Sequence, residues 1–113
     1  MLFRSPQLRV LYLSLNHISG TFPECVCRLT SLTALSLHNN QLTGPLPDSI
    51  GNLSQLRMLI LSDNQLTGPI PDSLANLKEN RTKLSLFGNN LSDEDKARVR
   101  ELVGKEEGLD LTL

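Results

Sequence analysis

The sequence predicts an α/β solenoid, a right-handed superhelix with one curved parallel β-sheet and a C-terminal capping helix and strand. Leucine accounts for 25 of the 113 residues and tryptophan is absent, which indicates one core environment repeated many times. Segments that begin at Leu8, Leu32 and Leu56 align without gaps at a spacing of 24 residues. Within each copy, leucines alternate with other residues, which is the spacing of a half-buried strand.

The strands are predicted from this alternation, because every second side chain of a strand points to the same face. One copy cannot bury its leucines alone, but copies stacked roughly 4.8 Å apart form a parallel sheet over a continuous core. A second apolar set, which includes Leu46, Ile50 and Leu53, should close an irregular convex side. Strands are expected near residues 10–14, 34–38, 58–62, 83–87 and 109–113, with Leu11/Leu13, Leu35/Leu37, Leu59/Leu61 and Leu84/Leu86 facing the core.

Asparagine recurs at one position of each copy, namely Asn16, Asn40, Asn64 and Asn89. A buried amide both donates and accepts hydrogen bonds, so a column of amides can satisfy backbone groups where the chain leaves each strand. The glycines and prolines that follow should bend the chain and limit regular pairing.

Two regions make up the chain. Residues 1–92 are the repeats, with a partial repeat over 1–7 and copies from 8, 32, 56 and 81, and residues 93–113 are a C-terminal cap. In the cap, Ser92 and Asp95 are spaced as in a capping box. Val99 and Val103 recur at helical spacing, and Gly104 is a plausible stop. The alternating segment 109–113 predicts the last strand.

The shared pattern LxxLxLxxNxLxGxxPxxLxxL over residues 8–92 resembles the leucine-rich-repeat family, in its plant-specific subtype. The subtype is marked by Gly44-Pro45-Leu46-Pro47 and Gly68-Pro69-Ile70-Pro71, with a weaker copy over residues 20–23. This subtype occurs in the ectodomains of receptor-like kinases and receptor-like proteins. The resemblance implies a repeat solenoid for protein binding and signalling, whose partners dock on the concave face of the sheet.

Large apolar residues at outward strand positions are the most informative candidates for binding, since nothing in the repeat requires them there. Exposed apolar and aromatic groups mark interaction surfaces. The alternative is that the sheet tolerates these residues for their strand propensity. The predicted ligand-binding residues on the concave face are Val10, Tyr12, Ser14, Leu15, Ser36, His38, Met58, Ile60, Asp63, Lys83 and Phe87.

Other classes of function lack support in the sequence. The net charge of −1 argues against nucleic acid as a main partner. No apolar run approaches the roughly 20 residues that cross a bilayer. We find no phosphate loop, catalytic grouping or cofactor motif. Cys25 and Cys27 should lie on the convex surface as free thiols, with an intermolecular disulfide as the alternative, and no metal site is expected.

The leading interpretation is therefore a module that binds a protein or peptide and is not an enzyme. The alternatives are a fragment of a larger leucine-rich-repeat receptor ectodomain or of a hydrolase-inhibitor protein. Met1 falls inside a repeat, without the family's Cys-containing N-terminal cap, so either the chain is a fragment or a partner covers that edge, where self-association is also expected.

The expected cellular compartment depends on whether the chain is a fragment of a receptor. As written, the chain lacks a signal peptide and would be cytoplasmic, whereas a piece of a receptor would be extracellular. The glycosylation patterns at Asn52, Asn80 and Asn90 are weak signals, because two arise almost automatically from the repeat.

Overall fold

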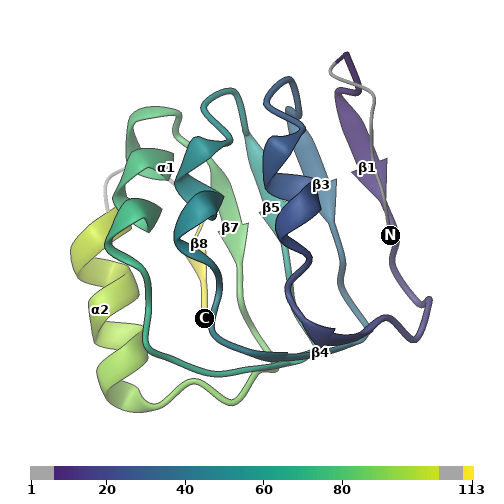
Figure 1. Cartoon of the computed structure of the whole chain (residues 1–113). Helices are drawn as coiled ribbons and strands as arrows, with labels where there is room; N and C mark the ends of the chain where they lie inside the picture. The colour runs from purple at the N-terminus through teal and green to yellow at the C-terminus, as the bar shows by residue number, and fades with distance from the viewer. Residues whose placement is uncertain (1–6, 105–110) are drawn as a thin grey trace.

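The computed structural model describes residues 7–104 and 111–113. Five parallel strands form the larger sheet in the order β1-β3-β5-β7-β8, which is also their order along the chain (Figure 1). This arrangement confirms the predicted solenoid sheet. The strands are β1 (Val10–Tyr12), β3 (Ala34–Ser36), β5 (Met58–Ile60), β7 (Lys83–Ser85) and β8 (Leu111–Thr112).

The register of this sheet reproduces the sequence repeat. Leu35 pairs with Leu11 on one side and with Leu59 on the other, so equivalent leucines form one row. The ladder continues beyond the strand ends, because the N–H of Leu13 donates to the carbonyl of Ser36 at 2.9 Å. Residues 109–110 of the predicted last strand lie outside the described residues.

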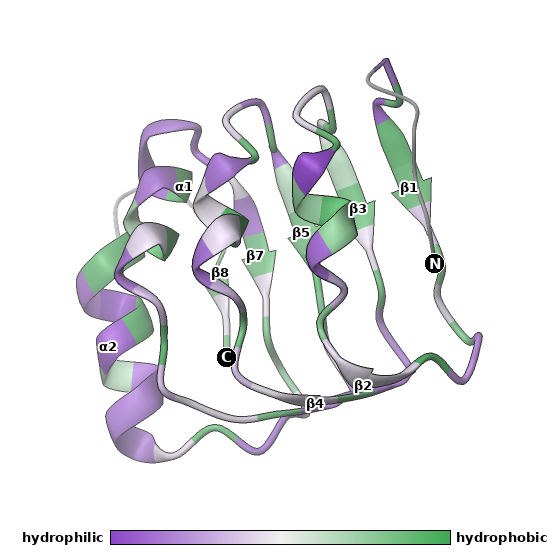
Figure 2. Cartoon of the chain, viewed as in Figure 1, coloured by the Kyte–Doolittle hydropathy of each residue, from purple (hydrophilic) through white to green (hydrophobic). Residues whose placement is uncertain are grey.

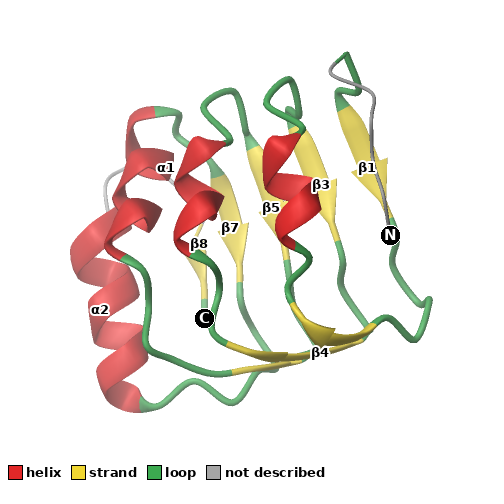
Figure 3. Cartoon of the chain, in the orientation of Figure 1, coloured by secondary structure: helices red, strands yellow, loops and turns green. Residues whose placement is uncertain are grey.

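The convex side is more regular than expected. Each of the first three copies contains a short 3₁₀ helix, and one α-helical turn follows the third. Pro23, Pro47 and Pro71 precede these helices, and their fixed φ favours a helix start where no backbone N–H donor is needed. Figure 3 shows these helices on the side opposite the large sheet. They are η1 (Glu24–Arg28), η2 (Asp48–Asn52), η3 (Asp72–Ala75) and α1 (Asn76–Glu79).

A second parallel sheet, which the sequence did not predict, precedes the prolines of each copy, and its strands end before Pro23, Pro45 and Pro69. Its strands are β2 (Ser19–Thr21), β4 (Gln41–Gly44) and β6 (Gln65–Leu66), in the order β2-β4-β6. Here Gly20 pairs with Leu42 and Gly44 with Leu66, an offset of 22 residues instead of 24. The stacking of the copies brings these segments together, and the paired residues Gly20 and Gly44 have left-handed φ of 83° and 73°.

The asparagine column satisfies backbone groups as predicted. The amide nitrogen of buried Asn64 donates to the carbonyls of Leu37 at 3.0 Å and Leu61 at 3.2 Å. Its Oδ1 accepts the N–H of Leu42 at 3.0 Å. The Asn64 side chain therefore hydrogen-bonds the backbone at the turn of its own copy and links that turn to the backbone of the preceding copy.

The same arrangement occurs at two more members of the column. Asn40 donates to the carbonyls of Leu13 and Leu37, each at 2.9 Å. Asn89 donates to the carbonyl of Leu86 and, in the preceding copy, to that of Leu61.

The region predicted as a C-terminal cap contains α2 (Asp93–Val103) and β8. Ser92 and Asp95 form the predicted capping box, each side chain accepting from the backbone N–H of the other residue. Val99 and Val103 are buried, and α2 packs on η3 and α1. Figure 1 shows α2 at the end of the solenoid that is opposite to β1.

The core lies between the large sheet and the convex helices and consists mainly of leucine. In Figure 2, hydrophobic colour follows much of β1, β3 and β5, whereas much of α2 is hydrophilic. Leu46, Ile50 and Leu53 are buried from the convex side, as predicted.

Replacing Leu61 with alanine tests the inward assignment of the leucines. Leu61 is 0% exposed and has copies on both sides. Leu61→Ala should lower the free energy of unfolding by about 2–5 kcal/mol through lost burial and the remaining cavity. Gln65→Ala, at an exposed position in the same copy, should cost less than about 0.5 kcal/mol. Urea denaturation measures both changes, and similar losses would contradict the assigned facing.

Candidate functional site

A hollow of about 250 Å³ lies on the concave face of the large sheet. All of the residues that line it belong to the predicted binding set. They come from the ends of β1 and β3 and from β5, so three neighbouring copies contribute. The lining residues are Tyr12, Ser14, Ser36, His38, Met58 and Ile60.

The hollow results from a small residue placed between two large ones. Ser36 pairs with Tyr12 on one side and with Ile60 on the other. Adjacent strands are about 4.8 Å apart, so the two large side chains rise roughly 10 Å from each other above the serine. A side chain of apolar character could enter this space.

Ser36 is less accessible than expected for a residue at an outward position. It is only 5% exposed, because its large neighbours cover it, and it forms the floor of the hollow. Its Oγ lies 2.8 Å from Nδ1 of His38, in a hydrogen bond whose direction depends on the tautomer of the histidine. This contact fixes a polar group at the base of a largely apolar hollow.

The remaining predicted residues lie outside the lining of the hollow. Asp63 and Lys83 are exposed, as predicted, and the carbonyl of Phe87 accepts the N–H of Asp63 at 2.8 Å. Met58 and Ile60, which do line the hollow, are half-buried. The most exposed large apolar residues of the described chain are Val10 at 47%, Tyr12 at 57%, Leu15 at 70% and Phe87 at 58%.

Leu15 occupies a left-handed backbone position that sequence reasoning did not identify. Its φ is 60°, and the equivalent residues Asn39, Asp63 and Gly88 have φ of 57°, 58° and 77°. Asparagine, aspartate and glycine tolerate this conformation, whereas leucine adopts it at a cost of about 1–3 kcal/mol. Neither the core nor the backbone conformation requires leucine here, and Leu15 adds to the accessible apolar surface. The signal available in the sequence was the Asn, Asp and Gly at the equivalent positions.

The expectation that both cysteines lie at the convex surface is wrong for Cys27, which is 2% exposed, while Cys25 is half-buried. Cys27 occupies the position of Gly51 and Ala75 in the next copies, where η1, η2 and η3 pack side by side. A Cβ at Gly51 would lie 2.7 Å from Cβ of Ser73, so this position favours small residues.

Within residues 7–104 and 111–113, no group of three or more His, Cys, Asp or Glu side chains is arranged to hold a metal ion. Over the same residues, no helix combines the length and apolar character that crossing a membrane requires.

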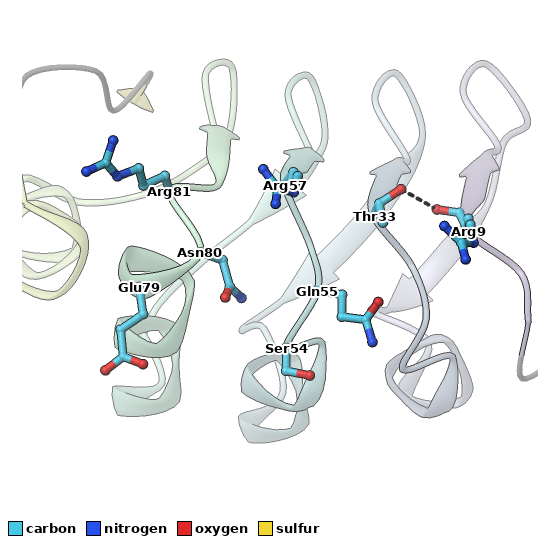
Figure 4. Close-up of a pocket in the computed structure, with 8 residues that line it drawn as sticks. All are labelled: Arg9, Thr33, Ser54, Gln55, Arg57, Glu79, Asn80 and Arg81. Carbon is cyan, nitrogen blue, oxygen red and sulfur yellow. Dashed lines mark hydrogen bonds between the residues drawn. The ribbon is translucent and has the colours of Figure 1, made fainter.

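Sequence reasoning also missed a polar groove at the edge where the strands begin (Figure 4). Two of its arginines, Arg9 and Arg57, occupy equivalent positions in the first and third copies. This recurrence was the feature of the sequence that could have indicated the groove. Thr33 occupies the same position between them.

Models of known protein families match the repeats of this chain. Leucine-rich-repeat models match residues 2–42 and 55–77. With its parallel sheet and periodic leucine core, the chain belongs to the leucine-rich-repeat family, and it is of the plant-receptor type. A search of curated protein sequences finds no match to this chain.

Solved structures share the fold. A leucine-rich-repeat protein of Leptospira interrogans superposes with a TM-score of 0.81 at 39% identity, over 96% of this chain and 26% of that protein. A second match is the ectodomain of the Arabidopsis thaliana receptor kinase GASSHO1/SCHENGEN3, solved in complex with CASPARIAN STRIP INTEGRITY FACTOR 2. It gives a TM-score of 0.70 at 29% identity, over 95% of this chain and 13% of that protein.

The Arabidopsis receptor kinase HAESA, solved with the peptide hormone IDA and the co-receptor SERK1, gives a TM-score of 0.66 at 35% identity, over 76% of this chain and 14% of that protein. The chain therefore spans about a quarter or less of the length of these three proteins.

The buried position of Cys27 can be tested by alkylation. Burial raises the pKa of the Cys27 thiol, and the thiolate is the reactive form. In a Cys25→Ser background, Cys27 should react with iodoacetamide at least about 100-fold more slowly in the folded protein than in denaturant. Mass spectrometry follows the modification. Equal rates in both conditions at one pH would show that the thiol is accessible and would contradict the assigned packing.

Proposed function

We propose that this chain is a non-enzymatic module that binds a protein or peptide segment across the concave face of its large sheet. The observation that carries the proposal is the hollow between Tyr12 and Ile60, and further exposed apolar side chains occur at Val10, Leu15 and Phe87. Accessible aromatic and aliphatic groups bordered by polar residues are typical of protein-binding surfaces.

The mode of binding follows from the shape of the hollow. An apolar side chain of the ligand would enter between Tyr12 and Ile60, above Ser36. Ser14 and Ser36 are small and leave room for the ligand backbone to cross the strands. His38 contributes a ring nitrogen beside the floor, which suits a polar contact that fixes the orientation of the ligand.

The structural relatives support a peptide or protein partner. The receptor kinase HAESA was solved with the peptide hormone IDA and a co-receptor, and the GASSHO1/SCHENGEN3 ectodomain with CASPARIAN STRIP INTEGRITY FACTOR 2. A segment of a longer receptor ectodomain is the second candidate, favoured by the small share of these proteins that the chain spans. The net charge of −1 gives nucleic acid no comparable support.

Binding energy should be concentrated in a few large residues of the concave face. A ligand is obtained by selecting a random peptide library against the immobilised protein. Tyr12→Ala, Ile60→Ala and Phe87→Ala should each weaken its binding by more than about 1 kcal/mol, or about fivefold in Kd, when measured by isothermal titration calorimetry.

Asp48→Ala is the matched control, because Asp48 is exposed on the convex side. It should leave Kd within about twofold, and thermal denaturation confirms that each variant is folded. Loss of binding in the convex variant, with the concave variants unaffected, would refute this site.

We also propose that β1, the terminal strand of the large sheet, supports self-association. Leu8, Leu11 and Leu13 are only half-buried there, and an edge strand presents unpaired backbone groups. The apparent mass from light scattering should therefore rise with protein concentration. A constant monomer mass over a wide concentration range would contradict this expectation.

A further inference from the structure

A polar groove of about 550 Å³ runs along the edge of the solenoid where the strands of the large sheet begin. It is formed by residues that precede β1, β3, β5 and β7 and by the ends of the convex helical segments. Figure 4 shows these residues between the helical turns and the strands. None of them lines the concave hollow. They are Arg9, Thr33, Ser54, Gln55, Arg57, Glu79, Asn80 and Arg81.

The groove is positively charged although the chain as a whole is not. Arg9, Arg57 and Arg81 against Glu79 give a local charge of +2, while the whole chain carries −1. Among residues 7–104 and 111–113, the arginine ion pairs are those of Arg98. The three guanidinium groups of the groove are therefore not neutralised by described carboxylates.

Backbone hydrogen bonds fix the spacing of the arginines. The carbonyl of Arg9 accepts the N–H groups of Thr33 at 2.7 Å and Ala34 at 3.1 Å. The carbonyl of Thr33 accepts those of Arg57 at 2.8 Å and Met58 at 3.1 Å. Arg9, Thr33 and Arg57 thus form one row across three copies, and the two arginines stand roughly 10 Å apart, at two strand spacings.

Thr33 keeps the space between the arginines open. Its side chain is short, and its Oγ1 donates to the carbonyl of Arg9 at 3.1 Å, which turns the hydroxyl toward the backbone (Figure 4). On either side of Arg57, the amide groups of Gln55 and Asn80 supply further donors along the groove (Figure 4). The groove therefore presents guanidinium groups at intervals, with neutral hydrogen-bond donors between them.

We propose that this groove binds an acidic, extended peptide segment of a protein partner. Guanidinium groups pair with carboxylates through two parallel N–H···O bonds. In a polyproline II segment, residues three apart lie on one side at a separation of about 9 Å, which matches the spacing of Arg9 and Arg57. Carboxylates at every third residue would therefore meet successive arginines. This surface is distinct from the concave face and does not rest on the function proposed for that face.

Fluorescence anisotropy with defined peptides tests the proposal. The probe is a fluorescein-labelled peptide of repeated Glu-Pro-Pro units, which places one carboxylate at every third position of a polyproline II chain. It should bind at least about tenfold more tightly than the Gln-Pro-Pro peptide, and Arg57→Gln should weaken its binding at least about fivefold. Arg28→Gln, an exposed arginine of η1 outside the groove, should change Kd less than about twofold. Thermal denaturation confirms that both variants fold.

Three results would overturn the proposal. The first is equal binding of the Glu and Gln peptides, and the second is an equal loss in the Arg57→Gln and Arg28→Gln variants. The third is equal binding of a peptide of the same composition with its glutamates consecutive, because that result indicates charge attraction without the predicted spacing. Binding of a sulfated polysaccharide in place of the peptide would likewise overturn the choice of a peptide ligand.

Discussion

The buried asparagine column is the interaction on which the rest of the fold depends. A stack of leucines favours burial but does not define where each turn of the chain begins. Asn64 defines it, because its amide donates to carbonyls in its own copy and the preceding one and accepts an N–H from that preceding copy. Without these contacts, buried backbone groups would lack partners at every turn, at a cost of about 1–3 kcal/mol for each group.

The fixed register also determines the surfaces. Since each copy adds one strand in line with the last, a side chain at a given repeat position has known neighbours on both sides. The side chains that occupy one row of equivalent positions then determine whether that part of the surface is hollow or charged. Serine between tyrosine and isoleucine produces the concave hollow, and threonine between two arginines produces the charged edge. The scaffold is uniform, whereas the variable positions carry the recognition.

Much of the fold could be predicted because it follows from periodicity. The strand positions, the asparagine hydrogen bonds and the capping box at Ser92 each rest on local pattern. The second sheet was missed because its offset of 22 residues arises from how copies stack, which no single copy encodes. The burial of Ser36 and Cys27 was missed for a related reason, since both are covered by side chains of neighbouring copies. The residues lining the hollow were all among those predicted, but their convergence into one site depended on residue sizes across the row.

Equilibrium urea denaturation of two asparagine variants tests the central role of the column most directly. Asn64→Ala removes three buried hydrogen bonds to backbone groups and should lower the free energy of unfolding by about 3 kcal/mol or more. Asn16→Ala, at the exposed end of the column, removes a bond to the carbonyl of Ser14 and should cost less than about 1 kcal/mol. Small and equal losses for both variants would contradict the account, because leucine burial alone would then be holding the copies in register.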